Sequence, residues 1–360
     1  MVTEILFFII ALFLLISGMD YIFGNKLGLG SQFKKGVEAS GSLALNMIGI
    51  YILAPLLTEG LMAVILPVTN LLRVDPSLVP ASLLAVDMGG YQLAQSLAMN
   101  QEMADFSGIL LASNLGATIS FSIPVALGMI KKEDLPFFLR GLVIGIITLP
   151  FGSFIGGMVQ GVSLYGLLRN CMPLFILSLL LAYATMRYTN QVVKCFGALS
   201  KIIVAMSVLG LILVGLEVVL GIPFLPKTMP PLSEAAEIVV RIGLFLAGAY
   251  PMLKVVEYLV KRYCKPFAKL LQVNETTIVG MIGSLASNLL TFVEVENMNT
   301  KGKVLASAVA ISGAFVLGGQ LAFVSTLSSE MVTPFIVSKV SGAILAIVMV
   351  QLTYKEGEVV

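Results

Sequence analysis

Histidine is absent from this chain of 360 residues, and its absence excludes several kinds of chemistry. Without an imidazole, no Ser-His or Cys-His catalytic pair can form. The usual proton shuttle and the commonest metal ligand are missing as well. The three cysteines, Cys171, Cys195 and Cys264, form no CxxC pair, so the sequence indicates neither a disulfide framework nor a metal site. We therefore expect no catalytic residues, no metal and no cofactor.

Charge is also scarce, and long apolar runs take its place. Only 12% of the residues are charged and 58% are hydrophobic, whereas a soluble protein is about one quarter charged. A net charge of +2 gives no basis for nucleic-acid binding. Several runs approach or exceed the roughly 18 apolar residues that mark a membrane helix. They are residues 5–23, 107–130, 135–158, 202–220 and 304–324. The composition predicts an all-α, polytopic membrane protein with roughly ten transmembrane helices in a single membrane domain, residues 1–360.

Lysine and arginine gather in three places, which indicate the orientation of the chain. The clusters lie at residues 25–37, 187–201 and 254–269. The positive-inside rule puts all three in the cytoplasm. The run at 5–23 has no basic segment before it and no cleavage site, so we expect a retained first helix rather than a signal peptide.

The two halves of the sequence resemble each other. LLRVDPSLVPASLLAVDMGG, from Leu71, matches LLQVNETTIVGMIGSLASNL, from Leu270, and further pairs of prolines recur at offsets between 196 and 199 residues. We predict a first repeat at 41–150, a second at 237–352, and connecting helices at 151–236. The clusters of positive charge require the repeats to have inverted topology, which is typical of secondary transporters. The pattern leaves open whether residues 61–72 and 254–270 span the membrane or lie flat.

In folds of this kind the substrate site lies near the midplane, where helices break. We expect broken membrane helices at residues 79–98 and 111–128 and at their second-half counterparts. The expected break positions are Gly89, Gly90, Pro124, Gly318 and Gly319.

Asp87, in LLAVDMGGYQLAQ, is the leading candidate for a binding residue. An unpaired carboxylate at the bilayer centre costs about 2.5–3.5 kcal/mol on insertion scales, so a cation must compensate it. A cationic substrate would do so. The alternative is a structural ion pair, with Arg73 or, more favourably, Arg140.

Other polar groups in the apolar runs complete the predicted site. Tyr91 follows Asp87 by four residues, and an aromatic ring beside a carboxylate suits an ammonium group; simple packing is an equal alternative for this ring. Amides in hydrocarbon need several partners, which makes them candidates for substrate binding. The remaining predicted binding residues are Gln92, Asn114, Ser122, Asn288 and Gln320.

These segments resemble the ethanolamine utilisation transporters, EutH. The matching stretches are SLLAVDMGGYQLAQSLA, TISFSIPVALGMI, GAYPM and TKGKVLASAVAISGAFVLGGQLAF, and the resemblance covers nearly the whole chain. It implies an inner-membrane permease that admits ethanolamine, with Asp87 as the acid of the DMGG motif and Asn288 as the amide of the second half. The family pattern G-D-H-L-G-F appears here as Gly318-Gly319-Gln320-Leu321-Ala322-Phe323, without its two ionisable residues. We therefore expect a divergent member.

The sequence thus predicts a permease for protonated ethanolamine that works by facilitated diffusion and alternating access. The expected partners are this substrate and the lipid bilayer, and a homo-oligomer is left open. One alternative is an H⁺- or Na⁺-coupled carrier of another small amine or polar solute. An intramembrane enzyme would need a paired acid, a histidine or a Ser-Lys pair at the membrane face, and the sequence offers no evident example. A scaffold or sensor is disfavoured because no sizeable cytoplasmic domain is evident.

Overall fold

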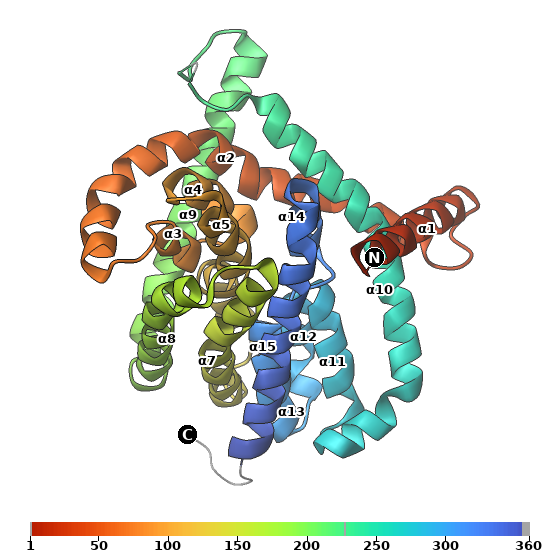
Figure 1. The fold of residues 1–360 in the computed structure, drawn as a ribbon. Coiled ribbons are helices and arrows are strands. Elements are labelled where there is room, and N and C mark those ends of the chain that lie inside the picture. The colour runs from red at the N-terminus through yellow and green to blue at the C-terminus, as the bar shows by residue number, and fades with distance from the viewer. Residues whose placement is uncertain (1, 227, 355–360) are drawn as a thin grey trace.

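The computed structural model describes residues 2–226 and 228–354, and within these ranges all regular structure is helical (Figure 1). Eight helical segments of the described chain are long and apolar enough to cross a membrane. Seven are single helices: α1 (Val2–Ile22), α2 (Gly30–Leu72), α7 (Leu135–Gln160), α8 (Leu164–Arg187), α9 (Thr189–Leu220), α10 (Leu232–Leu271) and α15 (Val332–Thr353). The eighth is the composite helix Gln101–Met129. The all-α membrane class is confirmed, but the count is eight rather than roughly ten.

Two long helices contain the segments whose placement in the membrane the sequence left open. Residues 61–72 are the last part of the continuous helix α2, and residues 254–270 are the last part of α10. Neither is a separate element. Both helices end at a residue in the left-handed conformation, Arg73 with φ 55° and Gln272 with φ 58°. In each case the N–H groups of the cap and of the next residue bond back to carbonyls of the last turn, which satisfies the helix end.

The segment after α2 is a hairpin rather than a broken span. It consists of α3 (Leu78–Leu83), η1 (Val86–Gly90) and α4 (Tyr91–Leu97). Its ends lie together, because Asp75 Oδ2 accepts a bond of 3.0 Å from Met99 N. Arms of six and seven residues are only about 10 Å long, far short of a bilayer core of about 30 Å. The segment in which a break was expected, 79–98, thus consists of two short arms that fold back on each other, and we call this unit hairpin 1.

The segment after α10 is built in the same way. Hairpin 2 consists of α11 (Glu275–Ala286) and α12 (Asn288–Glu294), followed by the short η4 (Val295–Asn297). Asn274 Nδ2 donates to Asn297 O at 2.8 Å, and Asn274 N donates to Asn299 Oδ1 at 3.2 Å. These bonds clamp the two ends of the hairpin together, so its tip lies at Ser287.

Each hairpin is followed by an interrupted helix. The first runs through α5 (Gln101–Asp105), η2 (Phe106–Gly116), η3 (Thr118–Ser122) and α6 (Ile123–Met129). The second consists of α13 (Thr300–Ser312) and α14 (Gly319–Leu327), with a non-helical stretch between them, and a short turn, η5 (Ser329–Met331), precedes α15. Asn100 and Asn299 cap these two helices alike, accepting from Met103 N and Gly302 N. The apolar run 304–324 is thus divided between Ser312 and Gly319.

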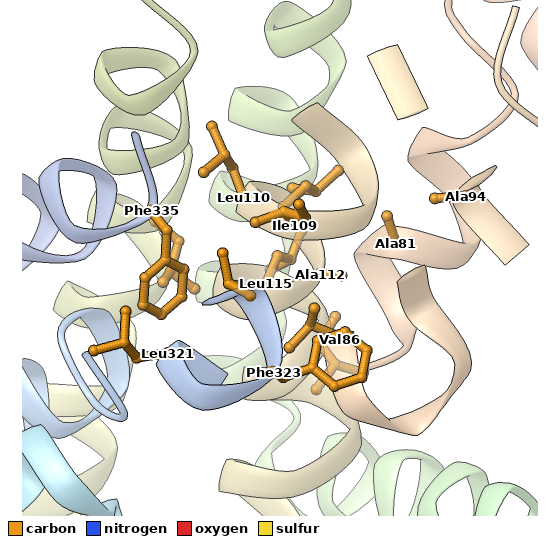
Figure 2. Packing of buried hydrophobic residues seen from close by; sticks show 14 of the residues in the cluster. Ala81, Val86, Ala94, Ile109, Leu110, Ala112, Leu115, Leu321, Phe323 and Phe335 are labelled. Atoms are coloured by element: carbon orange, nitrogen blue, oxygen red, sulfur yellow. The ribbon is translucent and has the colours of Figure 1, made fainter. Parts of the chain in front are cut away.

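The centre of the core lies around η2, which the other elements enclose (Figure 2). Ile109, Leu110 and Leu115 are fully buried there, with Phe323 of α14 and Phe335 of α15 close by. Glycine allows α7 to approach α15 closely, because a Cβ at Gly152 would lie 2.6 Å from the carbonyl oxygen of Ser338. The helix α15 also packs against η2, which in turn packs against hairpin 1.

The order of elements agrees with the predicted repeats. A long helix, a hairpin, an interrupted helix and a final spanning helix follow one another in each half: α2 to α7, and α10 to α15. The bounds 41–150 and 237–352, and the inverted topology, stay predictions.

Candidate functional site

A cavity of about 180 Å³ lies where the interrupted elements of the two halves meet. Hairpin 1 contributes Asp87 and Met88, and hairpin 2 contributes Ala286 and Ser287. Gln320, at the start of α14, completes the side formed by the second interrupted helix. Because one ordered water needs roughly 10–15 Å³ by this kind of measure, the cavity has room for a ligand of several heavy atoms.

Local backbone geometry places Asp87 at the tip of hairpin 1. Met88 and Gly89 depart from helical angles, and Gly89 has φ 93°. A Cβ at Gly89 would lie 2.2 Å from Ile50 Cγ2, so a larger residue fits neither the conformation nor the space. On the other side of the tip, Ala85 N donates to Ser120 Oγ at 3.0 Å. The turn AVDMGG, residues 85–90, is thus shaped by Gly89 and by the hydroxyl of Ser120.

Lys339 is a buried lysine that the sequence reasoning missed. It lies on α15, is only 2% exposed, and donates a hydrogen bond to the carbonyl oxygen of Ser113. It is not part of the cavity lining that contains Asp87. The signal was available, because Lys339 is the one basic residue within the apolar helix α15.

The arginines considered as partners of Asp87 lie elsewhere. Arg140 donates to Thr353 O at 2.9 Å and lies over the ring of Tyr354 at 5.2 Å. The carbonyl of Arg73 accepts a bond from Arg169 Nε. Neither arginine is part of the cavity lining that contains Asp87, so a structural pairing with Arg73 or Arg140 stays a prediction.

Gln320 lies opposite the acidic tip and is 3% exposed. Its Oε1 has no hydrogen-bond partner within the described part of the chain. Gly318 makes the approach of α14 to hairpin 2 possible, because a Cβ there would lie 2.0 Å from Ala286 O. Gly319, by contrast, would have open space around a Cβ. A buried carbonyl oxygen that lines a cavity without a partner is available to a donor on a ligand.

Asn288 and Ser122 join hairpin 2 to the first interrupted helix rather than line the cavity. Asn288 Nδ2 donates to Ser122 Oγ at 2.7 Å, and both side chains are buried. Pro124 follows at the second position of α6, where the π-helical pattern of η3 has given way to an α-helix. This bond holds the tip of hairpin 2 in place beside the cavity.

The remaining three predicted residues also lie outside the cavity lining. Tyr91 packs edge-on against Phe323, with ring centroids 5.9 Å apart. Asn114 Nδ2 donates to Ser153 Oγ at 2.9 Å and to Ser338 Oγ at 2.8 Å, which ties η2 to α7 and α15. Gln92 is buried, and neither polar atom of its side chain has a partner among the described residues. The structure therefore brings Asp87 and Gln320 together at one cavity and leaves the other five around it.

A second, more open cavity of about 400 Å³ adjoins the first. The two share Tyr250, Ala286 and Ser287. Lys35 and Lys254, from two of the clusters predicted to be cytoplasmic, line the outer one. The two cavities therefore adjoin at these three shared residues, and the outer one reaches residues of the predicted cytoplasmic clusters.

Fold and site together define a multi-pass helical membrane protein with a charged internal cavity between two hairpin tips. The family model for the ethanolamine utilisation protein EutH matches residues 2–352, and the chain belongs to that family. The resemblance read from the sequence motifs is thereby confirmed. As the family and the eight apolar helices indicate, it is a multi-pass protein of the bacterial inner membrane.

Relatives at moderate identity cover almost the whole chain. A protein of Listeria monocytogenes named "Probable ethanolamine permease EutH" is 37% identical over 346 residues, 96% of this chain and 92% of its own. A protein of the same name from Salmonella typhimurium is 34% identical, over 96% of this chain and 94% of its own. The uncharacterized protein YxeR of Bacillus subtilis is 37% identical, over 96% and 93%. No solved structure gives a significant match.

Proposed function

We propose that this protein is a permease for ethanolamine, and a carrier rather than an enzyme. The observation that carries the proposal is a carboxylate, Asp87, at the tip of a hairpin and facing a cavity inside a membrane protein. The names of the Listeria and Salmonella relatives support the choice of substrate.

The chemistry of the cavity suits a protonated amino alcohol. The ammonium group of ethanolamine pairs with Asp87, which replaces water as the partner of its charge. The hydroxyl group donates to Gln320 Oε1, which has no partner among the described protein groups. Because both groups are part of the protein interior, the substrate exchanges its hydration for fixed partners inside the bilayer.

Movement across the membrane follows from the two halves of the fold. In carriers with inverted repeats, one repeat-derived unit rocks or slides against the other around a fixed site. Here each half supplies one hairpin tip to the cavity. The cycle is facilitated diffusion, with the cavity facing one side of the membrane and then the other.

Uptake of labelled ethanolamine into proteoliposomes tests this function. Asp87→Asn removes the charge at almost constant shape, and a bond to a charged group contributes about 1.5–3 kcal/mol, so we expect uptake to fall at least about tenfold. Glu217→Gln makes the same change on α9, away from the cavity, and should leave uptake unchanged. Equal uptake by Asp87→Asn and wild type would show that Asp87 does not bind the substrate.

A further inference from the structure

The packing of the helices divides the described chain into two units, and this division does not follow the two halves of the sequence. The long helices α2 and α10 pack extensively on each other, and α1 and α9 pack on them. In the rest of the chain, α7 packs on α8, α13, α15 and η2, while hairpin 1 packs on η2 and hairpin 2 on α13. We call α1, α2, α9 and α10 the scaffold unit. The two hairpins, the two interrupted helices, α7, α8 and α15 form the hairpin unit.

Close backbone contacts hold the scaffold unit together. A Cβ at Gly36 of α2 would lie 2.4 Å from Ala247 N of α10, and a Cβ at Gly49 would lie 1.7 Å from Ser207 O of α9. Ser207 Oγ also donates to Leu45 O at 2.8 Å. Backbones that approach this closely over glycine cannot slide past each other without separating. The scaffold unit is therefore rigid where its helices cross.

Polar contacts between residues of different halves hold the hairpin unit together. Asn114 Nδ2 of η2 donates to Ser338 Oγ of α15 at 2.8 Å. Lys303 of α13 forms a largely buried ion pair with Asp134, which precedes α7. The tip of hairpin 2 is likewise bonded to the first interrupted helix. A movement of the first half against the second would have to break these buried contacts.

The interface between the two units is of a different kind. At the tip of hairpin 1, the group that meets Gly89 is the side-chain methyl of Ile50 rather than a backbone atom. In the described chain, the hydrogen bonds of α2 and α10 to the hairpin unit lie at or near the C-terminal ends of these helices, as with Gln351 Nε2 and Leu271 O. Few directional bonds therefore oppose a shift of one unit along the other.

The places where the chain passes between the units are suited to act as hinges. They are Arg73, Tyr188 and Gln272, and the backbone of each departs from helical angles. Pro55 in α2 and Pro251 in α10 each remove a helical hydrogen bond ahead of two of these places, and Figure 1 shows that α2 curves along its length. A few such positions can absorb the change in backbone angles that a movement of whole units requires.

The substrate cavity lies at the boundary between the units. Asp87 and Gln320 belong to the hairpin unit, whereas α2 and α10 supply the opposite wall, with Asn46 and Leu246 among its residues. We propose that the hairpin unit slides as one body along α2 and α10 and carries the bound substrate with it, an inference that rests on the proposed carrier function. Asp87 and Gln320 stay with the substrate, while the wall formed by the scaffold unit changes.

The two hairpins meet the scaffold unit differently, which identifies one end of the movement. Hairpin 1 is in tight contact with α2 at Gly89 and Ile50. Between hairpin 2 and the scaffold unit lies the outer cavity of about 400 Å³, with Lys35 and Lys254 on its scaffold side. The structure thus corresponds to the end of the movement at which the site lies nearer the predicted cytoplasmic side.

Distances between pairs of spin labels test which elements move together. The three native cysteines are changed to alanine, and labels are attached at Met158→Cys on α7, Tyr258→Cys on α10 and Leu352→Cys on α15, all exposed positions. Positions 258 and 352 lie in the same half but in different units. Positions 158 and 352 lie in different halves but in the same unit.

In liposomes, with and without ethanolamine, we expect two populations of the 258–352 distance that differ by at least about 5 Å, roughly one helical turn. The 158–352 distance should keep a single, unchanged maximum. Uptake of ethanolamine by each labelled protein shows that it is functional, and Ile344→Cys, also exposed on α15, replaces position 352 if that label lowers uptake.

A single, constant 258–352 distance would overturn the inference. A shift of the 158–352 distance would overturn it as well, because it would show that the two halves move against each other. These distances do not depend on the role of Asp87. Undiminished uptake by Asp87→Asn would therefore refute the proposed binding site, and the label distances would still decide whether the hairpin unit moves as one body.

Discussion

At the scale of single residues, Asp87 was conspicuous in the sequence. The importance of Gln320 and Lys339 depends on packing. Asp87 was evident because a lone acid interrupts an apolar run. Gln320 was one of several buried amides. It differs from Asn114 and Asn288 because it lines the cavity, whereas the other two donate to neighbouring hydroxyls. Lys339 was missed, although it is the one basic residue in the apolar helix α15. Sequence reasoning identifies costly groups but not which of them meet.

The assignment of Gln320 to the substrate hydroxyl gives a prediction with two substrates. Gln320→Met removes the amide at nearly constant volume. Because one hydrogen bond contributes about 0.5–1.5 kcal/mol, the half-saturation concentration for ethanolamine should rise about three- to tenfold. Ethylamine, which has the ammonium but no hydroxyl, should show no change. The measurement is uptake of each amine by the same proteoliposomes, and equal effects on both would assign Gln320 to packing.

At the scale of elements, the hairpins are the feature that hydropathy could not reveal. A run of about twenty apolar residues is the same in composition whether it crosses the bilayer or folds back at its midpoint. The difference lies in bonds between distant ends, such as Asp75 with Met99 and Asn274 with Asn297. The sequence nevertheless indicated break positions at Gly89 and Gly318. In the structure, the close approach of another group to each of these glycines leaves no room for a side chain.

Asp75 should be important for the stability of hairpin 1. Its buried carboxylate accepts from Ser77 N, Ser77 Oγ and Met99 N, so Asp75→Ala leaves buried donors without a partner. We expect a loss of about 1–3 kcal/mol, seen as a lower midpoint of thermal unfolding in detergent. Glu59→Ala, at an exposed position of α2, should stay within about 0.5 kcal/mol of wild type. A midpoint for Asp75→Ala as high as that of Glu59→Ala would contradict the clamp.

At the scale of the whole molecule, composition alone was enough to predict a helical, multi-pass membrane protein. The described residues hold eight candidate spans against the roughly ten expected, and two apolar segments are folded back as hairpins. The orientation depends on the clusters of positive charge. The same clusters are the only reason to regard the repeats as inverted, so orientation and repeat topology are tested together.

Cysteine labelling checks the orientation. Cys195 is exposed and lies in the cluster at 187–201, whereas Cys171 and Cys264 are buried and can be changed to alanine. In that background, a membrane-impermeant maleimide should label Cys195 in inverted vesicles and not in intact cells. Labelling from the outside of intact cells would reverse the assigned topology.

The central claim is that Asp87 holds the substrate by its ammonium group, and equilibrium binding to purified protein tests it most directly. Titration calorimetry would compare ethanolamine with ethylene glycol, in which a neutral hydroxyl replaces the ammonium, for wild type and Asp87→Asn. We predict that wild type binds ethanolamine at least about tenfold more tightly than Asp87→Asn does, and that the two proteins do not differ for ethylene glycol. Equal affinity of both proteins for ethanolamine would contradict the account.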